Sequence, residues 1–144
     1  MNDLLQRENI VLNQPKADRE EVIRRCGQML LDSGYINRRY IEGMIKRDNA
    51  FSTAIGNYIA IPHGEADYKK DIIQTGIVVL TFPEGIDWHG IPVFLVIGIA
   101  AKGDEHLDIL GNIVDCFEKE EDTINLVKNA GVDEVYTMLN GKNR

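Results

Sequence analysis

The sequence predicts one α/β domain, in which helices flank a small mixed β-sheet. Two observations lead to this fold class. The chain has 144 residues, 44% of them apolar and 27% charged, which suits a single buried core. Helical apolar periodicity alternates along it with short β-branched runs, and no linker, repeat or low-complexity segment intervenes. We therefore expect residues 1–144 to form one domain.

The first third of the chain predicts two amphipathic helices. The first spans residues 18–33, where Asp18 and Glu21 match a capping-box pattern and Gly34 provides a stop signal. Its apolar positions recur at helical spacing: Val22, Ile23, Cys26, Met29 and Leu30. The second helix spans residues 38–47, and one of its faces carries Tyr40, Ile41, Met44 and Ile45.

Three strands follow, and then three helices. The apolar, β-branched runs at residues 58–61, 76–82 and 92–101 predict the strands, and "FPEG" at 82–85 predicts a turn. The run "IPVFLVIGIAA" is too short to span a bilayer and fits a buried strand. The remaining patterns predict helices near residues 105–118, 120–129 and 132–139.

Charge and cysteine content narrow the function classes. The formal net charge of −7 disfavours a general nucleic-acid or anionic-membrane surface and favours a basic protein partner. The N-terminus lacks a basic segment followed by an apolar one, so we expect a cytoplasmic protein. Cys26 and Cys116 lie far apart without CxxC spacing, which predicts two small core residues rather than a disulfide framework or a zinc knuckle.

His63 occupies the position most typical of a reacting group. Pro62 biases Ile61 toward extended geometry and cannot donate to a sheet, so the strand should end there and place His63 at its end. Strand ends in α/β sheets combine a rigid scaffold with access for ligands. Gly64 removes steric bulk, which would let another molecule approach the ring.

Two further residues suggest a phosphate site around this histidine. His106 starts a predicted helix and shares a stripe with apolar residues, so it should point inward at a helix N-terminus, where backbone N–H groups favour anions. That stripe consists of Leu110, Ile113, Val114 and Phe117. Arg47 flanks the apolar face of the second helix, where it could cover the core or bind an oxyanion.

The residues leave other chemistries open but give them less support. Three histidines could suggest a zinc hydrolase, but no HExxH or similar spacing occurs, and we expect His89 to be a surface loop residue. Cys116 as a nucleophile would sit in mid-helix without the positive surroundings that activate a thiol. There is no P-loop and no DxD-like cluster, so we expect no cofactor and no metal.

Beyond these patterns, most of the chain resembles a known family. The stretches "KRDNAFSTAIGNYIAIPHG", "FPEGIDW" and "LVIGIAAKGDEHLDIL" are similar to the IIA component of the bacterial phosphoenolpyruvate-dependent sugar phosphotransferase system, in its mannitol/fructose class. The resemblance implies a five-stranded mixed sheet flanked by helices. It also implies a phosphotransferase that carries a phosphoryl group from the carrier protein HPr to a IIB domain.

The resemblance further implies roles for the residues singled out above. His63 would be the phosphorylated residue, with His106 and Arg47 supporting the phosphoryl group. A neutral imidazole is a good nucleophile near pH 7, and its N–P bond stays labile enough for onward transfer. The sequence looks most like mannitol-specific members; the alternative is a fructose-specific or nitrogen-regulatory IIA protein that signals through phosphorylation. Asn57 stands where some mannitol members carry an acidic residue.

A surface for HPr is also expected around His63. We expect an apolar ring drawn from Ile59, Ile61 and the loop near Phe82 and Trp88. Glu65 and Asp67 would form an acidic rim that faces a basic partner.

Overall fold

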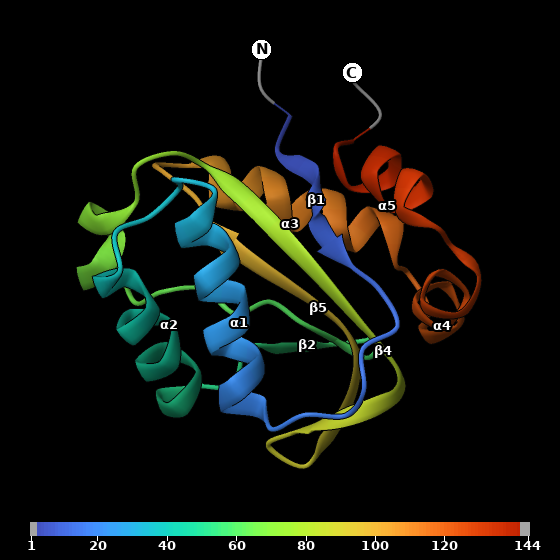
Figure 1. Cartoon of the computed structure of the whole chain (residues 1–144). Coiled ribbons are helices and arrows are strands. Elements are labelled where there is room, and N and C mark those ends of the chain that lie inside the picture. Colours follow the sequence, from blue (N-terminus) through green and yellow to red (C-terminus); the bar gives the residue numbers. More distant parts are fainter. Residues whose placement is uncertain (1–2, 142–144) are drawn as a thin grey trace.

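The computed structural model describes residues 3–141 and contains a five-stranded mixed sheet with the strand order β1-β4-β5-β3-β2 (Figure 1). The strands are β1 (Leu5–Val11), β2 (Ala54–Gly56), β3 (Ile59–Ala60), β4 (Gly76–Trp88) and β5 (Ile91–Ala100). β1 pairs with β4 and β3 pairs with β5 in parallel, whereas the β4–β5 and β2–β3 pairs are antiparallel. The predicted α/β class with a mixed sheet is therefore confirmed.

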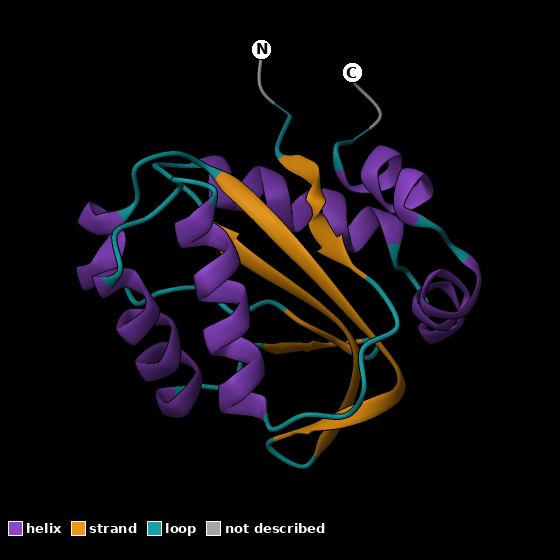
Figure 2. Cartoon of the chain, in the orientation of Figure 1, coloured by secondary structure: helices purple, strands orange, loops and turns teal. Residues whose placement is uncertain are grey.

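Helices cover both faces of this sheet (Figure 2). Along β4, Val78 and Leu80 contribute to the core beneath α1 (Arg19–Asp32) and α2 (Arg39–Ala50). Ile77 and Val79 point to the other core, beneath α3 (Glu105–Cys116), α4 (Glu120–Asn129) and α5 (Val132–Leu139). Successive side chains of a strand point to opposite faces, so a continuous apolar run fills both cores.

The predicted helices are present, with differences at their ends. The Asp18 side chain caps α1 by accepting from the Glu20 N–H at 3.2 Å, while the side chain of Glu21 pairs with Arg25 at 2.6 Å instead of completing a capping box. α2 continues to Ala50, beyond the expected end at residue 47. In α3 the buried stripe includes Ile109 and Ile113, whereas Val114 is 58% exposed, so the expected stripe was wrong at that position.

The strands differ more from expectation. The "FPEG" turn prediction was wrong, because β4 continues through it, and its pairing with β5 shifts register between Thr81 and Ile86. A register shift accommodates Pro83, which cannot donate to the ladder. The chain reverses instead at His89 and Gly90, whose φ angles of 53° and 88° suit a tight hairpin turn. β1 and β2 were not predicted.

The structure also bears on the two cysteines and on whether a helix could cross a membrane. Cys26 is fully buried, as predicted, and Cys116 is half-buried at the edge of the core beneath α3. Within residues 3–141, no helix combines the length and the apolar character that a membrane crossing requires.

Candidate functional site

His63 lies in the loop that follows β3 and is half-buried. Its Nδ1 is 2.6 Å from the carbonyl oxygen of Ile61. A carbonyl only accepts hydrogen bonds, so Nδ1 carries the proton and donates, which leaves the lone pair on Nε2. The geometry therefore fixes one tautomer with Nε2 as its nucleophilic atom.

The surroundings keep the His63 ring uncharged. Burial lowers the pKa of His63 to about 4, the hydrogen bond to Ile61 opposes this shift, and the charges of His106 and Arg47 add to it. The ring is thus neutral and able to act as a nucleophile at neutral pH.

His106 stands directly beside His63. It lies in the first turn of α3, and the two ring centroids are 4.9 Å apart with their planes inclined by 53°. Burial lowers the pKa of His106, and the positive charges of Lys69 and Arg47 lower it further. The Asp104 side chain does not cap this helix, so its carboxylate does not accept hydrogen bonds from the N–H groups of the first turn. A helix N-terminus with such groups favours an anion.

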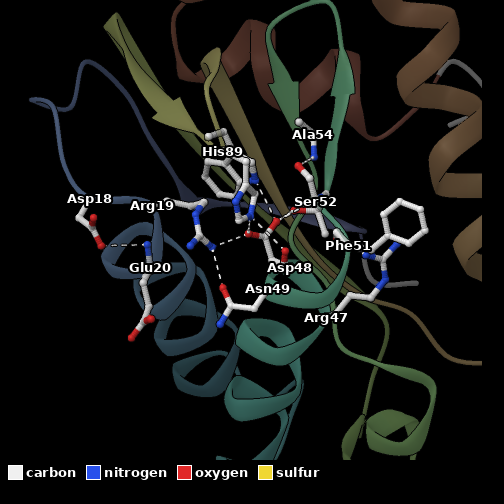
Figure 3. A network of polar contacts seen from close by, with 12 residues as sticks. Asp18, Arg19, Glu20, Arg47, Asp48, Asn49, Phe51, Ser52, Ala54 and His89 are labelled. Carbon is white, nitrogen blue, oxygen red and sulfur yellow. Dashed lines mark hydrogen bonds and ion pairs between the residues drawn. The ribbon is translucent and has the colours of Figure 1, made fainter.

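Arg47 lies in the last turn of α2 and is half-buried. Its guanidinium donates to the Phe51 carbonyl, and its Cζ lies 5.8 Å from the centroid of the Phe51 ring (Figure 3). Its charge lowers the pKa of both His63 and His106. The loop after β3 and the start of α3 thus place His63 beside His106, and the end of α2 places the charge of Arg47 within electrostatic range of both.

Lys69 is a charged neighbour of the site that the sequence analysis missed. It belongs to the 3₁₀ helix η1 (Ala66–Asp71), which follows the His63 loop, and it is exposed. Its charge acts on His106. The letters "DYKK" give no periodic signal, and the effect of Lys69 on His106 depends on the path of the chain through η1.

Asp48 is the centre of a polar network beside the site (Figure 3). This carboxylate is fully buried and accepts hydrogen bonds from four residues. The donors are Thr53 N at 2.8 Å, Thr53 Oγ1 at 2.6 Å, Trp88 Nε1 at 2.9 Å, His89 Nε2 at 2.8 Å and Arg19 Nη1 at 2.6 Å. Burial alone would raise the pKa of Asp48, but the hydrogen bonds from Thr53, Trp88 and His89 outweigh it and lower the pKa.

This network gives His89 a structural partner. His89 does lie in the turn between β4 and β5, as expected of a surface loop residue, and its side chain is 32% exposed. Its ring, however, binds Asp48. His63 and His106 are adjacent, whereas His89 is held by a carboxylate, and no three His, Cys, Asp or Glu side chains within residues 3–141 are grouped to hold a metal ion.

Asn57 lies away from the two histidines. It has a φ of 52° in the turn between β2 and β3, and its Nδ2 donates to the Phe117 carbonyl at 2.9 Å. Phe117 follows the end of α3 that is opposite to His106, and at 1.5 Å per residue the separation is roughly 16 Å. Asn57 therefore fixes a turn to α3 and is not a group of the site.

The expected apolar ring around His63 was wrong. Ile59, Ile61, Phe82 and Trp88 are at most 3% exposed, because they belong to the two cores. The exposed apolar side chains beside the site are instead Phe51 at 76%, next to Arg47, and Leu107 at 69%, next to His106 in sequence.

The expected acidic rim is only partly acidic. Asp67 is exposed and Glu65 is half-buried, as a rim requires. They share their segment with Lys69 and Lys70, which are also exposed, so the charge beside His63 is mixed.

Comparisons with known proteins agree on one family. Residues 3–142 match the family described as "Phosphoenolpyruvate-dependent sugar phosphotransferase system, EIIA 2". The chain is 40% identical over 136 residues to the mannitol-specific phosphotransferase enzyme IIA component of Halalkalibacterium halodurans, covering 94% of each chain. It also resembles the structure of enzyme IIA-mannitol in complex with phosphorylated enzyme IIB-mannitol from Escherichia coli. That match has a TM-score of 0.87 and 33% identity, and it covers 96% of this chain and 100% of the other. The crystal structure of IIA-mannitol from E. coli matches with a TM-score of 0.83 and 34% identity, covering 93% and 97%.

Proposed function

Since the chain belongs to the EIIA 2 family of the phosphoenolpyruvate-dependent sugar phosphotransferase system, we propose that it accepts a phosphoryl group from phosphorylated HPr on His63 and passes it to a IIB domain. The observation that carries the proposal is the state of the His63 ring. Its Nδ1–H is engaged by the Ile61 carbonyl, and its lowered pKa keeps the Nε2 lone pair available. We assign Nε2 as the phosphorylated atom.

The covalent step follows from that assignment. The Nε2 lone pair attacks the phosphorus of the donor phosphohistidine, an N–P bond forms on His63, and the N–P bond of the donor breaks with its electron pair returning to the donor nitrogen. The phosphorylated ring keeps its proton on Nδ1, where the Ile61 carbonyl stabilises the developing positive charge. The IIB nucleophile then attacks the same phosphorus, and the N–P bond of His63 breaks with its electron pair returning to Nε2.

Neighbouring groups of the site would stabilise the transferring charge. The transition state spreads negative charge over three equatorial oxygens, so catalysis depends on positioning and on nearby positive groups. We assign this role to the charge of Arg47 and to His106 and the N-terminus of α3 as hydrogen-bond donors. In support, Arg47 lowers the pKa of both histidines, and His106 lowers the pKa of His63. Lys69 adds a second permanent cation.

We propose mannitol as the sugar that the complete system takes up, because the most similar relatives and structures reported above are mannitol-specific. The sugar itself would meet other components, so this chain would contribute through the IIB surface that it fits. We also place the protein in the cytoplasm, where HPr would supply the phosphoryl group. Transfer to IIB domains of the mannitol, fructose and regulatory classes, compared side by side, tests this assignment against its alternatives.

Intact-protein mass spectrometry tests the central step. Incubation with phosphoenolpyruvate, the general phosphotransferase enzyme and HPr should add one phosphoryl group that is labile in acid and stable in base, as expected of a phosphoramidate. His63→Ala should accept none, whereas His89→Gln, which changes the histidine bound to Asp48, should still accept it. Stoichiometric labelling of His63→Ala would overturn the proposal.

A further inference from the structure

The hydroxyl group of Tyr40 lies between two backbone segments next to His63. It accepts a hydrogen bond from the Gly64 N–H at 2.8 Å and donates one to the Ile99 carbonyl at 3.0 Å. Tyr40 is 2% exposed, so water does not compete for these bonds. A phenolic oxygen donates and accepts at once, and Tyr40 thereby links the residue after His63 to the end of β5.

A second hydrogen bond holds the other side of His63 to the same point. The Ile99 N–H donates to the Pro62 carbonyl at 2.9 Å. Ile99 thus fixes the chain before His63 directly and the chain after it through Tyr40. A backbone held on both sides leaves the ring few orientations, and its bond from Nδ1 to the Ile61 carbonyl selects one of them.

The Tyr40 ring also explains Gly64. A Cβ atom on Gly64 would lie 2.5 Å from Cε1 and 2.9 Å from Cζ of Tyr40, far inside van der Waals contact. The expectation that Gly64 leaves room for another molecule was therefore wrong, because Tyr40 fills that space. Glycine is required here for the close approach of a side chain of the same protein.

Burial also keeps this hydroxyl protonated. It raises the pKa of Tyr40 to about 12, although the hydrogen bond from Gly64 acts in the opposite direction. The hydroxyl therefore remains a donor to Ile99 at any pH at which transfer proceeds.

We propose that Tyr40 is a positioning residue for phosphoryl transfer: its hydroxyl holds the Gly64 amide against β5, so that Nε2 of His63 stays aligned with the incoming phosphoryl group. The inference rests on His63 being the acceptor. In-line transfer requires alignment of the reacting atoms, and a displacement of about 1 Å can cost about a hundredfold in rate. Tyr40 and Arg47 lie about two turns apart on α2, so one helix positions both the loop and the guanidinium.

Two conservative variants test the role. Tyr40→Phe removes only the hydroxyl, and Tyr35→Phe is the matched control, because Tyr35 is also buried, at 4% exposure, in the same core. Quench-flow measurement of transfer from phosphorylated HPr should show the rate constant at saturating donor lowered about tenfold in Tyr40→Phe. The donor concentration for half-saturation should not change, since a buried residue does not touch the donor. Tyr35→Phe should match the native protein in both quantities.

The amide of Gly64 gives a readout that is independent of transfer. Its hydrogen exchange, measured by NMR, should become faster in Tyr40→Phe and remain native in Tyr35→Phe, because only the former loses its acceptor.

Several outcomes would overturn the inference. A native rate in Tyr40→Phe would do so, and so would an equal loss in Tyr35→Phe, which would indicate general loosening of the core. If Tyr40→Phe does not fold, Gly64→Ala is the second variant, because it disturbs the same contact while keeping the hydroxyl. A native transfer rate in folded Gly64→Ala would also reject the inference. Failure of the proposed function is distinguishable, because it appears as labelling of His63→Ala in the otherwise native protein.

Discussion

On the proposed role of His63 as the acceptor, its charge state determines when this protein can accept a phosphoryl group. Burial and two neighbouring positive groups lower the pKa of His63 to about 4, against about 6.5 for an ordinary histidine. The ring should therefore stay neutral through the range in which a free histidine becomes protonated. Titration of the ring nitrogens by ¹⁵N NMR should give a midpoint near 4, with the proton of the neutral form on Nδ1. A midpoint near 6.5 would show that the site does not tune this residue.

The same shift affects stability with a definite sign. Between pH 6.5 and about 4 the unfolded chain binds a proton on this histidine and the folded chain does not, so the free energy of unfolding decreases as the pH falls through that window. His63→Gln should show a weaker decrease than the native protein in urea unfolding at these pH values.

Rate measurements can distinguish a role of Arg47 and His106 in phosphoryl transfer from a purely structural role. Arg47→Ala and His106→Ala should each slow transfer from phosphorylated HPr by about a hundredfold, the loss typical of one oxyanion donor. Arg47→Lys, which keeps the charge but not the planar fork, should retain part of the rate. If His106→Ala unfolds the domain, while transfer in the fraction that remains folded is native, His106 is a core residue and leaves the site.

At the scale of elements, Asp48 connects parts of the fold that meet beside the site. Its carboxylate joins α2 to the first residue of α1 through Arg19, to the segment before β2 through Thr53, and to the β4–β5 turn through Trp88 and His89.

Removing that carboxylate should cost far more stability than breaking a surface pair. Asp48→Ala leaves several buried donors without an acceptor and should lower the free energy of unfolding by about 3 kcal/mol. Arg24→Ala is the control, because Arg24 and Glu20 form a pair whose side chains are 51% and 44% exposed, and it should cost less than about 1 kcal/mol. Equal losses in urea unfolding would contradict a special role for Asp48.

At the scale of the whole molecule, the net charge of −7 bears on partner encounter. Phosphoryl relays require fast association and release, and exposed charges steer encounter over about 8 Å at physiological ionic strength. Transfer from phosphorylated HPr should slow as salt is added. The double variant Glu65→Lys/Asp67→Lys should start slower and respond less. A native rate indifferent to salt would leave shape and the exposed Phe51 and Leu107 as the basis of recognition.

The sequence by itself determined the local features of this protein. Periodicity located the helices, because the burial of one helical face repeats every 3.6 residues whatever the helix packs against. Pro62 and the β-branched run before it placed His63 at a strand end. Strands β1 and β2 were not predicted from the sequence. The burial pattern of β1 alternates poorly and β2 has only three residues, so both depend on their partner strands in the sheet.

The tertiary structure alone decided which side chains meet. It placed His106 beside His63, put the charge of Lys69 near His106, bound His89 to Asp48 and placed Asn57 at the far end of α3. It also showed that the space beside Gly64 holds the Tyr40 ring rather than a partner molecule. Periodicity reports only that a face is buried, whereas the atom that fills a given space comes from a residue far away in the chain and is fixed by the packing of whole elements.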